Sequence, residues 1–86
     1  MILMEDNREI EHMVEFLTSL VKKFRTIFPN HEYLRETRNV YDIYISPWMD
    51  KFLLPNREPD REYDERIKNR ILETISELNK FLEKQQ

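Results

Sequence analysis

The segment HEYLRETRNVYDIYIS, residues 31–46, decides the fold that the sequence predicts. Its second half is rich in β-branched and aromatic residues, which favour strands: Val40, Tyr41, Ile43, Tyr44 and Ile45. We therefore expect one strand over residues 31–37 and another over residues 40–46. They are joined by a turn at Arg38-Asn39, which lacks the glycine usual in tight hairpins.

An antiparallel register with Thr37 opposite Val40 is favoured by the side-chain pairs that it creates. These pairs are Leu34–Ile43, Arg35–Asp42 and Tyr33–Tyr44. One of them joins opposite charges and another joins two aromatic rings, and both combinations stabilise neighbouring strands. The segment is thus predicted to form a β-hairpin with one tyrosine-bearing face.

Two long helices are predicted on either side of this segment. Residues 7–28 follow Asp6, which with Glu9 three residues later has the form of a capping box, and they carry apolar residues at every third or fourth position up to Pro29. Residues 60–83 carry a second apolar stripe of the same spacing, together with oppositely charged pairs four residues apart. Both patterns indicate amphipathic helices that bury one face.

The predicted fold class is α+β, in the order α-β-β-α, with the two long helices packed on one face of the hairpin. A short helix is expected over Ser46–Leu54, before a polar linker at residues 55–59. The alternative for residues 51–54 is a third strand. Residues 1–6 are expected to be a flexible N-terminus, and residues 7–84 a single small domain.

The composition narrows the function classes. The chain has 86 residues, a net charge of −3, no cysteine and no glycine. Without glycine, phosphate-binding loops, dinucleotide fingerprints and nucleophile elbows cannot be present in their standard form. The sequence also lacks the roughly 20 consecutive apolar residues of a membrane span and the apolar stretch of a secretory signal. We therefore expect a cytoplasmic protein.

The sequence offers no catalytic or metal-binding constellation. Glu9 and His12 match half of a di-iron signature, but the second glutamate-histidine pair that such a site needs is missing. The serines have no identifiable histidine base nearby in the sequence. We predict a non-enzymatic domain without catalytic residues, metal or cofactor.

Binding to a partner is therefore the predicted activity. The outer edges of a hairpin present unpaired backbone groups, which a second copy of the chain or a partner's strand would cover. The candidate partner-binding residues are Tyr33, Arg35, Tyr44 and Trp48. The prediction is a protein–protein interaction module, such as a small inhibitor, an antitoxin-like neutraliser or an assembly subunit. It would bind through the hairpin edge, the tyrosine face and the amphipathic first helix, and would form a homodimer.

The alternative prediction is a nucleic-acid-binding regulator. Basic residues gather at the end of the first helix and across the predicted hairpin: Lys22, Lys23, Arg25, Arg35 and Arg38. Such a cluster could contact phosphates while the tyrosines stack on bases. Because the chain as a whole is acidic, this function ranks second.

Overall fold

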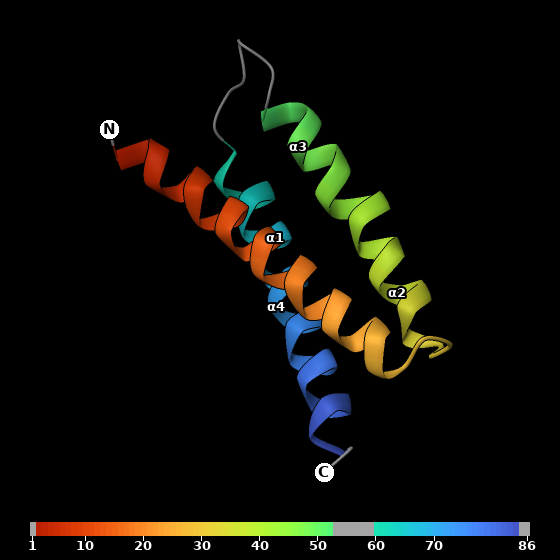
Figure 1. Ribbon diagram of the computed structural model, residues 1–86. Coiled ribbons are helices and arrows are strands. Elements are labelled where there is room, and N and C mark those ends of the chain that lie inside the picture. The colour runs from red at the N-terminus through yellow and green to blue at the C-terminus, as the bar shows by residue number, and fades with distance from the viewer. Residues whose placement is uncertain (1, 53–59, 85–86) are drawn as a thin grey trace.

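The structure is a computed structural model that describes residues 2–52 and 60–84, and every regular element in them is helical (Figure 1). The elements are α1 (Ile2–Ile27), α2 (Tyr33–Asn39), the π-helix η1 (Val40–Ile45), α3 (Ser46–Phe52) and α4 (Arg61–Lys84). Because α2, η1 and α3 follow one another without a break, they form one continuous helical arm. The described residues thus make three arms: α1, α2–η1–α3 and α4.

The structure confirms the two long helices and the burial of the apolar stripe that each one carries. Residues at the predicted spacing are buried along α1 and α4: Ile10, Leu17, Val21, Phe24, Ile67, Ile71 and Leu78. Helix α1 begins at Ile2, earlier than predicted, so that Asp6 lies inside the helix rather than at its cap. At the start of α4, the Asp60 carboxylate accepts a hydrogen bond from the backbone N–H of Tyr63 at 3.0 Å, which caps the helix.

The predicted β-hairpin is wrong. Residues 33–45, which include most of both predicted strands and the turn between them, belong to α2 and η1, and the described residues contain no strand. The fold is therefore all-α rather than α+β. The predicted strand register, hairpin edge and tyrosine-bearing sheet face do not exist. Tertiary burial overrides the local strand preference, since Thr37, Val40, Ile45 and Trp48 all point into the helical core.

The π-helix η1 explains how a strand-favouring sequence is accommodated in a helix. In an ideal α-helix, Val40 and Ile45 would lie about 140° apart, because each residue advances the helix by about 100°. Both are fully buried here, at 0% and 1% exposure. The wider turn brings them to one side, and its hydrogen bond runs from the N–H of Ser46 to the carbonyl of Tyr41, five residues back.

Helix α3 confirms the predicted short helix from Ser46 as far as Phe52. The third strand considered for residues 51–54 is contradicted at Lys51 and Phe52, which are helical. The rest of that segment and the predicted linker lie outside the described residues.

Contacts between the arms fix their directions. The rings of Phe24 in α1 and Phe81 in α4 lie 5.9 Å apart near the ends of both helices, so α1 and α4 run in the same direction. The middle arm runs the opposite way, since Tyr33 at its start also contacts Phe81, with ring centroids 5.2 Å apart. At its other end, Trp48 donates a hydrogen bond to Asp64 near the start of α4 at 3.1 Å. Figure 1 shows the path: α1 runs downward in the view, the middle arm upward and α4 downward again.

The molecule is elongated, with extents of 45 × 21 × 18 Å. Within the part of the chain that the structure describes, each helix is too short or too polar to cross a bilayer.

Candidate functional site

A groove of about 540 Å³ lies between the end of α1 and the start of the middle arm, beside the turn that joins them. The residues that line it are Val21, Arg25, Pro29, Leu34, Thr37, Arg38 and Tyr41. We call it the α1–α2 groove. Its buried or half-buried members are Val21, Leu34, Thr37 and Tyr41, whereas Arg25 and Arg38 are exposed. The groove therefore combines a floor that is only partly apolar, through Val21 and Leu34, with two positively charged side chains at its rim.

Helical spacing places the two arginines on facing walls. Arg25 lies one turn after Val21 in α1, and Arg38 lies one turn after Leu34 in α2. Below them, the hydroxyls of Tyr41 and Thr18 share a hydrogen bond of 2.6 Å that ties η1 to α1. The tie holds the two walls at a fixed separation.

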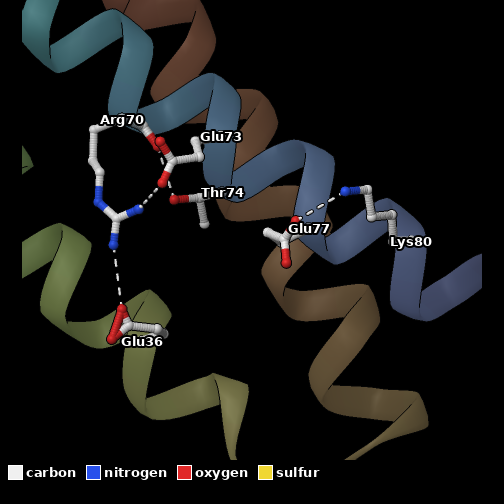
Figure 2. A network of polar contacts seen from close by, with 6 residues as sticks. All are labelled: Glu36, Arg70, Glu73, Thr74, Glu77 and Lys80. Carbon is white, nitrogen blue, oxygen red and sulfur yellow. Dashed lines mark hydrogen bonds and ion pairs between the residues drawn. The ribbon is translucent and has the colours of Figure 1, made fainter.

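On α4, in contrast, the basic side chains of Arg70 and Lys80 are paired with carboxylates (Figure 2). Arg70 reaches across to Glu36 of α2 at 3.2 Å and contacts Glu73 of its own helix at 2.8 Å. Lys80 lies 3.2 Å from Glu77. These charges are compensated within the domain, so they are weak candidates for binding a charged partner.

The basic residues singled out from the sequence are exposed, and none forms an ion pair with a described residue: Lys22, Lys23, Arg25, Arg35 and Arg38. The chain carries a net charge of −3, so removing these five positive charges leaves −8 on the remainder. The molecule is therefore strongly polarised, with uncompensated positive charge where α1 meets α2.

The fold does not gather all of these basic residues at one place. Arg25 and Arg38 line the groove, and Lys22 and Arg35 each lie three residues before one of them. Lys23 lies two residues from both Val21 and Arg25, which places it about 200° around α1, on the far side of the helix from the groove.

Of the predicted partner-binding residues, Tyr33, Tyr44 and Trp48 turn toward α4. Tyr33 packs on Phe81, and the guanidinium of Arg70 lies 5.6 Å from the centre of the Tyr44 ring. Trp48 is only 2% exposed. In this structure the three aromatic rings contribute to packing within the domain, and of the four predicted residues Arg35 is the exposed one.

Two tyrosines in this packing have shifted acidities. Burial raises the pKa of the Tyr33 hydroxyl and that of the Tyr63 hydroxyl above their ordinary value. The neighbouring carboxylate of Asp64 raises the pKa of Tyr63 further. Both phenols are therefore neutral at physiological pH.

Sequence reasoning missed the groove itself, which the two arginines form together with Val21, Pro29, Leu34, Thr37 and Tyr41. The signal was present in the four-residue spacing that joins Leu34 to Arg38, which is characteristic of a shared helix face. Reading residues 31–37 as a strand concealed it.

The histidines and the acidic side chains were also considered as metal ligands or catalytic groups. The described residues hold no group of three or more histidine, aspartate or glutamate side chains placed to share a metal ion. His12 lies 3.8 Å from Glu15 on the exposed surface of α1. The Nδ1 atom of His31 accepts a hydrogen bond from the backbone N–H of Tyr33 at 3.0 Å, which gives this histidine a structural role in the turn.

No protein-family model, no curated protein and no solved structure matches this chain.

Proposed function

We propose that this domain is a non-enzymatic protein-interaction module whose α1–α2 groove binds a short acidic and apolar segment of a partner protein. The observation that carries the proposal is that Arg25 and Arg38, which form no ion pair with any described residue, lie on either side of a partly apolar floor in an otherwise acidic chain.

The composition of the groove supports a protein ligand. Interfaces between proteins combine apolar contact with a polar rim, and arginine is enriched at the residues that contribute most to affinity. Each guanidinium can donate two parallel hydrogen bonds to a carboxylate of the ligand. A volume of about 540 Å³ lies within the range of sites that accept a few side chains.

Nucleic acid is the second candidate and fits the same cluster less well. A polyanion would extend beyond the groove and meet the acidic remainder of the molecule, whose net charge is −8 without the five basic residues. Single-stranded ligands also need aromatic rings free to stack on bases. Tyr33 and Tyr44 are instead packed against α4, and the hydroxyl of Tyr41 is bonded to Thr18.

The proposal is tested by fluorescence anisotropy with a labelled short peptide of alternating glutamate and leucine. We expect the double substitution Arg25→Glu and Arg38→Glu to weaken binding by at least about tenfold, equivalent to ~1.4 kcal/mol. The matched control is Arg61→Glu with Arg66→Glu, which makes the same change in net charge at exposed positions of α4. The control should bind like the unmodified protein.

Two further probes separate the alternatives. A peptide of alternating glutamate and serine, which lacks apolar side chains, should bind more weakly if the apolar floor contributes. Tighter binding of a single-stranded oligonucleotide than of either peptide, lost steeply as salt is added, would instead support the nucleic-acid function. Equal binding by both double variants would contradict a role for the groove.

A further inference from the structure

Helices α1 and α4 expose large apolar side chains on the side of the molecule that faces away from the middle arm. Phe16 is 56% exposed and Ile27 43% exposed on α1, and Leu72 is 54% exposed on α4. We call the surface around them the outer face, and it also includes the half-buried residues Met13, Leu20 and Ile75.

One ion pair between the helices establishes the position of the outer face. Glu9 of α1 and Lys68 of α4 form an ion pair at 3.6 Å where the two helices meet. Phe16 follows Glu9 by seven residues and Leu72 follows Lys68 by four, so each lies on the same side of its helix as a member of this pair. Phe16 and Leu72 therefore flank the line along which α1 and α4 touch.

The middle arm lies on the opposite side of both helices. It contacts α1 through Thr18, which is bonded to Tyr41, and it contacts α4 through Arg70, which is bonded to Glu36. Thr18 lies two residues after Phe16, and Arg70 lies two residues before Leu72. Two residues correspond to about 200° around a helix, so the middle arm cannot cover the outer face.

We propose that a second copy of this chain covers the outer face, with the two α1 helices antiparallel and Phe16 on the two-fold axis. Several large apolar side chains exposed on one side of a molecule mark an interaction site. The charges on the face point to a second copy as its occupant, because they complement one another under this symmetry.

The complementarity follows from the spacing along α1. Glu9, Phe16 and Lys23 are separated by seven residues each, so the acidic and the basic side chain lie about 10.5 Å from Phe16 in opposite directions. When two antiparallel helices cross at Phe16, Glu9 of each copy faces Lys23 of the other. Both side chains are exposed; Glu9 also pairs with Lys68 of its own chain at 3.6 Å, and Lys23 has no ion pair with a described residue.

A two-fold interface uses the same patch on both copies, so one apolar centre and one pair of opposite charges are sufficient to build it. The α1–α2 groove opens on the opposite side of the molecule from Phe16 and stays accessible in the dimer. Self-association and ligand binding in the groove are therefore independent of each other.

The first test measures molecular mass by sedimentation equilibrium over a range of protein concentrations. The unmodified chain should sediment as a dimer that dissociates on dilution. Phe16→Glu should sediment as a monomer with unchanged helical circular dichroism. Ile43→Glu is the control, because Ile43 is 62% exposed on η1 in the middle arm and its substitution should leave the dimer intact. A monomeric unmodified chain, or a dimer unaffected by Phe16→Glu, would overturn the proposal.

The second test is specific for the antiparallel geometry. Glu9→Lys alone places two lysines opposite each other at both ends of the interface, and Lys23→Glu alone places two glutamates there. Each variant should dissociate at least about tenfold more readily than the unmodified chain. In an equimolar mixture of the two, both ends again join opposite charges, and a one-to-one heterodimer should form. If the mixture stays as dissociated as the single variants, the pairing about Phe16 is wrong.

Discussion

At the scale of single residues, Tyr33 connects local burial to the stability of the whole fold. Its ring is half-buried against Phe81, and burial raises the pKa of its hydroxyl. The carboxylates of Glu77 and Glu36 act in the same direction, whereas the positive charge of Arg70 opposes them. The folded state therefore favours the neutral phenol.

This pKa shift makes stability depend on pH in the alkaline range. Because the folded pKa of Tyr33 lies above the ordinary value of 10.0, the folded protein keeps a proton that the unfolded chain releases there. The contribution of neutral Tyr33 to the free energy of unfolding is complete below about pH 10 and decreases as the pH rises from about 10 through the folded pKa.

In urea unfolding at about pH 8 and about pH 11, Tyr33→Phe should lose less stability between the two conditions than the unmodified protein. An equal loss in both proteins would show that Tyr33 makes no such contribution.

The same residue shows a limit of sequence-based site prediction. Tyr33, Tyr44 and Trp48 have the side-chain types that are enriched at interfaces, and the sequence predicts them as binding residues on that ground. The same large rings also dominate the cores of small domains. Residue type alone cannot decide between these roles, because the decision depends on which side of the element faces α4.

At the scale of elements, the two long helices could be predicted because their signals agree, whereas the helix start predicted at Ser46 lies inside the continuous middle arm. Apolar spacing, the aspartate that caps α4 and the proline after α1 all indicate helices there. In residues 40–45 the signals conflict, since β-branched and aromatic residues favour a strand locally while burial requires a helix. Sequence reasoning followed the local preference and missed both the middle arm and the groove that it forms with α1.

The π-helix η1 leads to a prediction about the deletion of a single residue. The wider turn of η1 contains one residue more than an α-helical turn. Deletion of the exposed Ile43 should therefore give a regular α-helix in which Val40, Ile45 and Trp48 are still buried. We expect the free energy of unfolding to stay within about 1 kcal/mol of the original. Deletion of the exposed Ser19 from the middle of α1 is the control, since it rotates the following core residues by about 100°.

Thermal unfolding followed by circular dichroism distinguishes these outcomes. The Ile43 deletion should melt cooperatively near the original temperature, whereas the Ser19 deletion should lose its cooperative transition. If the Ile43 deletion unfolds like the Ser19 deletion, the π-turn is required for the packing and does not simply accommodate an extra residue.

At the scale of the whole molecule, the positive charges could be found from the sequence, but their distribution in space could not. Clustering along the chain identified Arg25, Arg38 and Lys23 as members of one group. The fold divides this group, because Arg25 and Arg38 enter the groove while Lys23 lies toward the outer face. A one-residue difference in position along a helix changes the direction of a side chain by about 100°, so the division depends on which side of α1 is buried.

Phe24 and Phe16 test whether the three arms unfold as one unit. Phe24 is 0% exposed and joins α1 to α4 and to the turn before the middle arm, since its ring centroid lies 4.9 Å from that of Phe28, 5.0 Å from that of His31 and 5.9 Å from that of Phe81. Phe24→Ala should lower the free energy of unfolding by about 3–5 kcal/mol, which is a large part of the ~5–15 kcal/mol typical of a folded domain.

Phe16→Ala is the matched control, because it removes the same atoms from the same helix at a position that is 56% exposed. In dilute solution, where the chain is monomeric, it should change the free energy of unfolding by less than about 1 kcal/mol.

Chemical unfolding followed by tryptophan fluorescence reports on Trp48 in the middle arm, and circular dichroism reports on all the helices. If the arms form one cooperative unit, the two signals coincide for Phe24→Ala as they do for the unmodified protein. A loss of fluorescence at lower denaturant concentration than the loss of helix would instead show that the middle arm separates from α1 and α4 first.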